Sequence, residues 1–333
     1  VLYQILGGRL GQRFVPVFLD MQAMAVSGDH DFLGRMADII QNSIPEDCPN
    51  DFEMELFANQ DSNPFTAFER FIDCVLKSIG RRKLLLLFDE YELIEDKVED
   101  GKISKDIFFF LSGLVEHKEG LYLIFAGNHR LQEREKDYWQ PLLHRCEYRN
   151  ISFLTESDTR RLILEPVRER IYYLGSSVDQ ITRLTAGQPF YTQLFCRNVV
   201  EYLNREKRNY FSNSDIQIVV NEIVDNPPPQ LIYFWAGLSR EEKLTLSLSA
   251  NLLKGPDQSV SARDILQQVE KYSLPLQLDV FKKACDSLVN REVLARTSGD
   301  EYHYRMELLR IWIKEEHNLY SLFRELEHDY SFD

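Results

Sequence analysis

The segment KLLLLFDE, residues 83–90, decides the fold class of this 333-residue chain. Its near-continuous apolar run from Leu84 to Phe88 predicts a strand at Lys83–Asp89 that is covered on both faces, as is typical of a central strand in a parallel sheet. Asp89 and Glu90 follow directly, so this strand delivers two acids to its carboxyl end. Ligands of open α/β sheets bind at that end. The segment therefore predicts an α/β core and a place for its site.

Strand and helix signals alternate on either side of this segment. The run FVPVFLD at 14–20 is rich in β-forming residues and ends in an acid, and LYLIFAG at 121–127 predicts another buried strand. Helical spacing of apolar residues recurs at 1–9, 64–79 and 107–115. A weaker strand is expected at 147–153, and the acidic run 95–100 predicts a solvated loop. This order predicts parallel βαβ units with right-handed crossovers.

The chain becomes all-helical from Thr155 onward. Thr155 with Asp158, and Ser214 with Gln217, have the capping-box pattern of a helix start. The helices expected here run to about Pro166, from 177 to 187 and from 189 to about 203. The stretch Asn226-Pro227-Pro228-Pro229 predicts a stiff extended boundary.

Three further helices and a hairpin are expected beyond this boundary. The helical patterns cover 239–253, 261–272 and 280–291. Two short strands at 293–296 and 302–306 flank Ser298-Gly299-Asp300, which is a hairpin signal. A final helix carries Trp312, which we expect, like Trp235, to be a core residue. Three helices followed by a hairpin is the order of a winged helix-turn-helix.

The composition excludes several classes of protein. There are 53 Asp and Glu against 39 Lys and Arg, a formal net charge of −14 that does not favour nonspecific binding to nucleic acid or anionic lipid. No apolar run approaches the ~20 residues that span a bilayer, and no secretory leader is recognised, so a cytoplasmic protein without membrane contact is expected. The 5 cysteines lack CxxC spacing and the 7 histidines do not cluster, which favours reduced thiols over disulfides or a zinc site.

Asp89 and Glu90 could divide the work of phosphoryl-transfer chemistry. Asp89 would hold Mg²⁺, directly or through water, and Glu90 would polarise the attacking water, which is the Walker B arrangement of P-loop nucleotidases. The alternative is a hydrophobic strand that ends in an acidic turn. No GxSxG or HExxH pattern supports a hydrolase triad or a zinc protease.

Two further positions could contribute to the same site. Asn128 and Arg130 lie just past the strand 121–127, where an NTPase senses the γ-phosphate, although a plain polar turn is an equal alternative. Gly187 and Pro189 place a helix stop against a helix start, so that free backbone groups can approach a base or phosphate. The alternative at these two residues is an ordinary inter-helix turn.

Four segments together resemble the STAND branch of the AAA+ ATPases, signalling ATPases of bacteria and archaea. They are VPVFLDMQ at 15–22, LLLLFDEYELIE at 84–95, LYLIFAGNHRL at 121–131 and the region from LTESD at 154 to LTAGQPFYTQLFC at 184–196. The resemblance extends roughly from Val1 to Trp312, and its parts occur in the family's order. It implies an α/β fold, namely a parallel-sheet P-loop NTPase-like core followed by an all-α lid and a winged helix-turn-helix.

The resemblance also implies domain limits and partners. We expect a nucleotidase core at 1–153, a helical lid at 154–226, a winged helix-turn-helix at 230–320 and a C-terminal tail at 321–333. ATP or ADP and Mg²⁺ are the implied cofactors, and a homo-oligomer or an effector domain or protein is the implied partner.

Single residues of this sequence match the family's motifs. Asp89 and Glu90 match Walker B, and Asn128 and Arg130 match the sensor 1 region. Gly187 and Pro189 match the GxP motif of the lid, which lies beside the nucleotide in the family. Arg145 lies near the place where some AAA+ proteins carry an arginine finger that acts in trans.

The sequence departs from the family in one large respect. No GxxxxGK[ST] motif occurs, and Gly7-Gly8 and Gly11 lack the lysine and hydroxyl that follow in a P-loop. The helix expected at 1–9 resembles the one that follows Walker A, so we expect the motif and its strand to precede Val1 in a longer protein.

Two functions from other classes stay open. The missing motif favours a nucleotide-independent interaction or scaffold module on a degenerate NTPase fold. A DNA-binding regulator is less favoured, because residues 238–333 hold 13 basic and 17 acidic side chains. The candidate recognition helix at 280–291 carries Lys282, Lys283 and Arg291 but also Asp286, and Asp279 lies just ahead of it.

Overall fold

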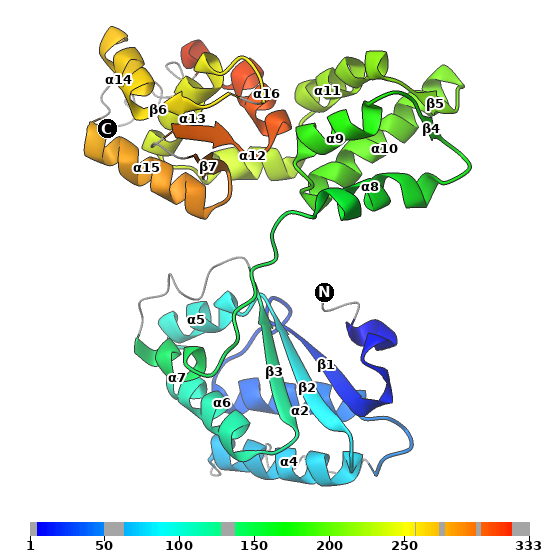
Figure 1. Cartoon of the computed structure of the whole chain (residues 1–333). Coiled ribbons are helices and arrows are strands. Elements are labelled where there is room, and N and C mark those ends of the chain that lie inside the picture. Colours follow the sequence, from blue (N-terminus) through cyan, green and yellow to red (C-terminus); the bar gives the residue numbers. More distant parts are fainter. Residues whose placement is uncertain are drawn as a thin grey trace. The chain divides into compact units, whose positions relative to one another are not determined.

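The computed structural model describes residues 5–49, 63–127, 137–256, 258–272, 277–297 and 301–321. The chain divides into two compact units, Val1–Arg149 and Asn150–Asp333. Each unit has its own secondary structure and is described by itself below (Figure 1).

The first unit contains a three-stranded parallel sheet. Its strands are β1 (Phe14–Asp20), β2 (Lys83–Asp89) and β3 (Leu121–Ala126), in the order β1-β2-β3. All three strands were predicted, and β2 is central as expected. Residues 84–88 of β2 are at most 3% exposed, which agrees with the prediction of a strand covered on both faces. The unit is therefore an α/β fold with a parallel sheet.

Helices cover one face of this sheet (Figure 1). They are α2 (Asp29–Ser43), α4 (Pro64–Ile79), α5 (Glu92–Glu99), α6 (Asp106–His117) and α7 (Gln140–Leu143), the last preceded by a 3₁₀ turn at Asp137–Trp139. Their apolar side chains pack on alternate strand residues such as Val17, Leu86 and Phe125. On the opposite face, Leu85 and Leu87 pack against the residues around Ile5 and Phe18.

Four expectations for this unit need correction. The acidic run 95–100 is not a loop, because most of it belongs to α5. Glu95 is buried in this helix, where its carboxylate accepts a hydrogen bond from Trp139 Nε1. No strand forms at 147–153. Of the helix expected at 1–9, the described part is one π-helical turn, Ile5–Arg9, with a non-helical Gly8. Strand β3 is an edge strand among the described residues, so it is less buried than predicted.

The second unit begins with a helical group. It comprises α8 (Glu156–Leu164), α9 (Ser177–Thr185), α10 (Pro189–Glu206) and α11 (Ile216–Asp225), with a short parallel pair β4 (Tyr172–Tyr173) and β5 (Tyr210–Phe211). Thr155 caps α8 as predicted, through the backbone N–H of Asp158. The second capping box is formed by Ser212 and Asp215, two residues before the predicted pair Ser214 and Gln217.

The rest of this unit is helical with a small antiparallel sheet. Its helices are α12 (Pro229–Ala236), α13 (Arg240–Leu252), α14 (Ala262–Lys271), α15 (Leu278–Asn290) and α16 (Glu307–Glu316). Its strands are β6 (Val260–Ser261), β7 (Leu294–Arg296) and β8 (Glu301–Tyr304), in the order β6-β8-β7. The β7–β8 pairing agrees with the hairpin prediction, although its turn at 298–300 lies outside the described residues.

One hydrophobic core runs through this second unit. It extends from Ile163 to Ile313 and includes Trp235 and Trp312, both predicted as core residues. The stretch Asn226–Pro229, which was expected as a boundary, lies inside this second unit. Pro228 occupies the N-cap position of α12 in an extended conformation. All 5 cysteines are free thiols, as expected. In the part of the chain that the structure describes, no helix has the length and apolarity to cross a bilayer.

Candidate functional site at the carboxyl edge of the sheet

The carboxyl ends of β1, β2 and β3 meet at one edge of the sheet. In the strand register, Asp20 at the end of β1 is opposite Asp89, and Asp89 is opposite Ala126. Neighbouring strands lie ~4.8 Å apart and opposite residues share a face, so the two aspartates are direct neighbours. The register thus forms an acidic pair that strand prediction alone did not reveal. The available signal was the acid that ends FVPVFLD.

Asp89 and Glu90 are half-buried at this edge. Neither side chain makes a hydrogen bond or ion pair to another residue within the described ranges. A carboxylate with a purely structural role is usually hydrogen-bonded or ion-paired when it is buried. Their oxygens are therefore available to a ligand as far as the described residues are concerned.

The turn that presents Glu90 has an unusual backbone. Glu90 has a φ of 50°, in the left-handed region, which costs ~1–2 kcal/mol for a residue other than glycine. Hydrogen bonds on both sides hold this turn: the Tyr91 N–H donates to the Ala126 carbonyl at 3.2 Å, and the Met21 N–H donates to the Asp89 carbonyl at 3.3 Å. Such strain persists where the surroundings enforce it, and it is concentrated at functional sites.

Gly127 allows a close approach beside this turn. A Cβ added at Gly127 would overlap the Glu92 Oε2 atom and would come within 2.7 Å of Tyr91 Cε1. Only glycine therefore fits at the end of β3 while Tyr91 and Glu92 keep their places. The sequence contained a weak signal for this, a glycine directly after an apolar strand.

Asp20 is held by its own turn and lies near a cation. Its Oδ1 accepts hydrogen bonds from the backbone N–H groups of Gln22 (2.9 Å) and Ala23 (3.3 Å). Lys97 of α5 donates from Nζ to the Met21 carbonyl at 2.9 Å. Burial, and then the charge of Lys102, lowers the pKa of Lys97, against the opposing effect of Asp96 and Asp20.

The donor set at this edge suits a hard divalent cation. Asp20 and Asp89 supply carboxylate oxygens, which Mg²⁺ prefers. Among the residues that the structure describes, no three His, Cys, Asp or Glu side chains are close enough to hold a metal by themselves. Mg²⁺ is usually held by one or two carboxylates with water and phosphate oxygens, so the edge fits Mg²⁺ together with a phosphate-bearing ligand.

The other predicted residues of this unit have different outcomes. Asn128 and Arg130 lie outside the described residues, directly after Gly127 in the chain. Arg145 is half-exposed and forms an ion pair with Glu116 through Nη2 and Oε2 at 2.7 Å. Its guanidinium is therefore engaged within its own unit.

Gly187 and Pro189 lie in the second unit. Ala186 and Gly187 both have left-handed backbones, with φ of 53° and 76°. The Gly187 carbonyl accepts from the Leu154 N–H at 2.9 Å, and a Cβ at Gly187 would lie 2.5 Å from Thr159 Oγ1. Gly187 is therefore buried by the start of α8. Pro189 begins α10 as predicted.

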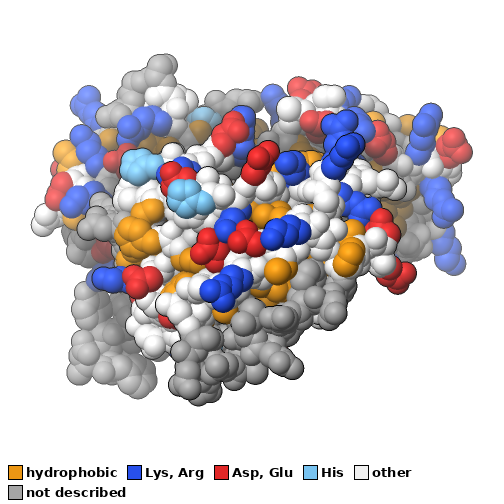
Figure 2. All heavy atoms as spheres, turned by 90° about the horizontal axis from the view of Figure 1, so that it is seen from below, with side chains coloured by type: hydrophobic (Ala, Val, Ile, Leu, Met, Phe, Trp, Pro, Cys, Tyr) orange, Lys and Arg blue, Asp and Glu red, His pale blue; other side chains and the backbone are white. Residues whose placement is uncertain are grey.

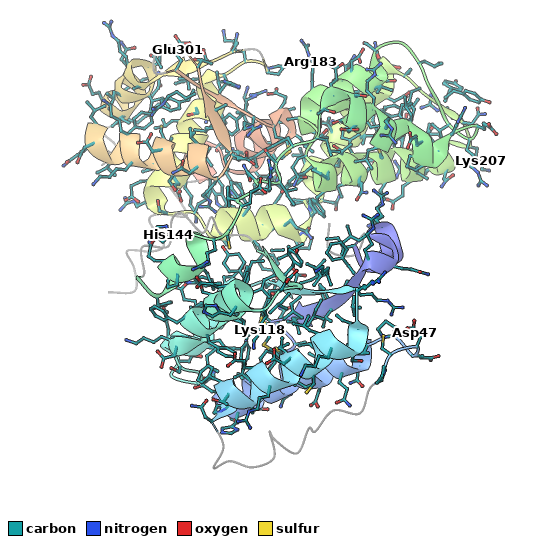
Figure 3. The ribbon with its side chains drawn as sticks, turned by 60° about the horizontal axis from the view of Figure 1, so that its bottom comes forward. Asp47, Lys118, His144, Arg183, Lys207 and Glu301 are labelled. Atoms are coloured by element: carbon teal, nitrogen blue, oxygen red, sulfur yellow. The ribbon has the colours of Figure 1, made fainter. Side chains whose placement is uncertain are left out.

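A trough lies beside this turn, within the second unit. It has a volume of about 440 Å³ and adjoins a second hollow of about 620 Å³. Ala186 and Thr159 line the first part, and Arg183, labelled in Figure 3, lines both parts. The turn predicted as a nucleotide contact thus borders a hollow with charged walls.

Basic and acidic side chains are mixed on the described surface that Figure 2 shows. On α15, Lys282 and Lys283 are exposed together with Asp279 and Asp286, and Asp286 accepts from Arg296 Nη2 at 2.7 Å. This arrangement does not favour a DNA-reading helix, since such helices usually carry a basic face.

No protein-family model matches this sequence, and no curated protein matches it. Among solved structures, a Walker-type ATPase of Pyrococcus abyssi matches with a TM-score of 0.61 and 11% identity, over 94% of this chain and 87% of that chain. The ORC2 protein of Aeropyrum pernix, solved as ADPNP–ADP complexes, matches with a TM-score of 0.54 and 12% identity, over 94% of this chain and 82% of that chain. This chain therefore shares the overall fold of these two proteins. At these identities the likeness concerns the fold alone.

Proposed function

We propose that this chain is an ATP-binding signalling ATPase of the STAND type within the AAA+ class, a nucleotide-dependent switch that controls self-association or an effector. One observation carries the proposal: Asp89 and Glu90 lie at the carboxyl end of the central strand of a parallel sheet, beside Asp20. The carboxylate oxygens of Asp89 and Glu90 make no hydrogen bond or ion pair with a described residue. Ligands of open α/β sheets bind outside the carboxyl ends of the strands, so this edge is the expected nucleotide edge.

Each acid has a role in this proposal. Asp89 holds Mg²⁺ directly or through water, with Asp20 available as the neighbouring oxygen donor. Bound Mg²⁺ neutralises charge that develops on the phosphate oxygens. Glu90 accepts a hydrogen bond from the attacking water and orients it, and the fixed turn around Glu90 keeps its carboxylate in place.

The finer organisation is part of the same proposal. Residues 1–153 are the nucleotidase core, 154–226 the helical lid, 230–320 the winged helix-turn-helix and 321–333 the tail. Asn128 and Arg130 sense the γ-phosphate, and Gly187 and Pro189 present the lid to the nucleotide. The protein acts in the cytoplasm as a homo-oligomer or with an effector, and the loss of γ-phosphate contacts changes its assembly.

Calorimetric titration with ATP and ADP tests this proposal. The protein translated from its native start codon should bind both nucleotides, and ATP more tightly with Mg²⁺ than with EDTA. Asp89→Asn should remove most of the Mg²⁺ dependence, because it removes one charged ligand. The matched control is Asp106→Asn, an exposed acid at the start of α6. No nucleotide binding by the native-start protein would overturn the proposal.

A second candidate is a nucleotide-independent interaction module on the same fold. The absence of GxxxxGK[ST] from the 333 residues favours it. It predicts that neither ATP nor ADP shifts the melting temperature of the native-start protein, whereas a bound nucleotide stabilises the folded state by mass action.

A further inference from the structure

A buried carboxylate lies behind the turn that carries Glu90. Glu95 of α5 is 4% exposed, and its oxygens accept hydrogen bonds from Trp139 Nε1 at 3.2 Å and from Tyr138 Oη at 3.3 Å. A carboxylate out of water is stable only with such donors. Glu95 therefore fixes two neighbouring aromatic residues that come 43 and 44 positions later in the chain.

Trp139 is the central member of a packed aromatic cluster. It is 1% exposed, and its ring centroid lies 4.1 Å from that of Phe108 on α6. Tyr91 meets Trp139 edge to face, with centroids 5.5 Å apart and planes at 84°. This is the preferred geometry of aromatic pairs, in which a positive ring edge meets a negative face. The indole ring of Trp139 thus packs against the Tyr91 ring and restricts its position.

Tyr91 in turn restrains Glu90, which precedes it. The Tyr91 N–H donates to the Ala126 carbonyl, and the Tyr91 ring fills the space over Gly127. Because Glu90 has a left-handed φ, its carboxylate direction depends on this restraint. A continuous set of contacts therefore leads from Glu95 through Trp139 and Tyr91 to Glu90.

We infer that Glu95 and Trp139 are positioning residues for the Glu90 carboxylate, a role that rests on the proposed ATPase activity. Both residues are buried, with 4% and 1% exposure, so they act on Glu90 through other residues. Their hydrogen bond and the edge-to-face contact hold Tyr91, and Tyr91 holds the strained turn. The pair thereby sets the direction of the Glu90 carboxylate toward the attacking water.

Glu95→Leu tests this role in the native-start protein. A displacement of ~1 Å in a reacting group can reduce the rate ~100-fold, so we expect kcat for ATP hydrolysis to fall 10- to 100-fold. The Kd for ADP should stay within about threefold, because binding does not need the direction of the Glu90 carboxylate. Glu95→Gln keeps an acceptor for the indole N–H and should retain kcat within about fivefold of wild type.

Two further variants keep the result interpretable. Trp139→Phe keeps an aromatic ring and removes the N–H donor, so it should lower kcat about 5- to 20-fold with little change in the Kd for ADP. If Glu95→Leu does not fold, the kcat of Trp139→Phe tests the positioning role by itself. The control is Lys118→Met; Lys118 is labelled in Figure 3 and lies just before the amino end of β3. Its ammonium group pairs with Glu69 and Asp73 at 2.9 Å. This control should lower the melting temperature and leave kcat unchanged.

The outcomes separate the inference from the proposed function. If the wild type hydrolyses no ATP, the proposed function fails. If the wild type turns over and folded Glu95→Leu or Trp139→Phe keeps its kcat, the inference fails while the function stands. Equal losses of kcat in these variants and in Lys118→Met would also overturn the inference, since they would indicate a general loss of stability.

Discussion

The guanidinium of Arg305 lies over the ring of Phe153, with its Cζ 4.1 Å from the ring centroid. Glu292 joins the same contact: its Oε1 accepts from Arg305 Nη1 at 2.9 Å and from Ser152 Oγ at 2.7 Å. Ser152 and Phe153 are among the first residues of the second unit, a few positions before α8. Residues near the β7–β8 pair therefore hold the chain segment that enters the helical group.

Arg305→Ala should destabilise the second unit. The change removes a cation–π contact and leaves the half-buried Glu292 with one partner fewer, so we expect a loss of about 1–3 kcal/mol. Urea unfolding followed by the fluorescence of Trp235 and Trp312 measures it. The matched control is Arg296→Ala, whose guanidinium lies 5.3 Å from the Tyr302 ring and pairs with exposed Asp286. Equal losses in both variants would refute the special role of Arg305.

Gly127→Ala should destabilise the first unit by about 1–3 kcal/mol, because the added Cβ overlaps Glu92 and crowds Tyr91. Gly113→Ala on α6 is the control, since a Cβ there meets no atom within 4 Å and removes glycine from a helix interior. We expect it to stabilise the unit by ~0.5–1 kcal/mol. Thermal melts that show no difference between the two variants would contradict this packing.

Gly187→Ala should cost more than a left-handed φ alone. Gly101 has a φ of 68° with nothing within 4 Å of a Cβ, so Gly101→Ala isolates the backbone cost of ~1–2 kcal/mol. At Gly187 the Cβ would also meet Thr159 Oγ1 at 2.5 Å and the Leu154 carbonyl at 2.8 Å. We expect an additional loss of about 1–3 kcal/mol in denaturant unfolding. A smaller loss of unfolding free energy in Gly187→Ala than in Gly101→Ala would contradict the predicted overlap with Thr159 and Leu154.

Asp215 should make the second unit sensitive to acid. Burial alone would raise the pKa of Asp215, but hydrogen bonds from Arg208 and Ser212, with a further one from Tyr202, outweigh burial and lower it to about 2. A carboxyl whose pKa is lowered on folding stabilises the protein above its unfolded pKa, and this contribution disappears as the pH falls to the folded pKa.

The window for this loss is therefore between pH 3.8 and about 2. Asp215→Asn should be less stable than wild type at pH 7 by about 1–3 kcal/mol and should lose less stability across that window. Urea melts at several pH values measure both effects. Parallel losses in the two proteins would show that other groups govern the acid response.

Much of the fold could be predicted from local patterns. The strands at 14–20 and 83–89 were predicted with their observed limits, since apolar runs bounded by polar residues are strong signals. Helix α2 was missed because acids and Gly34 interrupt its apolar spacing. The helix over Glu95 was missed because its acids suggested solvent, whereas Trp139 and Tyr138 supply donors from a distant segment.

The candidate site was predictable only in part. Asp89 and Glu90 could be identified because the apolar run of a buried strand ends directly before them in the sequence. Asp20 was not recognised as their neighbour, because register between strands depends on pairing across more than sixty residues. The contact between Gly127 and Glu92 also depends on tertiary packing, which local propensity does not contain.

Glu90→Gln in the native-start protein tests the central claim most directly. The amide keeps the size of the side chain and removes the negative oxygen that orients water. We predict that ATP binds with a Kd within about threefold of wild type, while single-turnover hydrolysis falls by about 100-fold or more. Unchanged hydrolysis in a variant that still binds ATP would contradict the assignment of Glu90 and, with it, the account of this site.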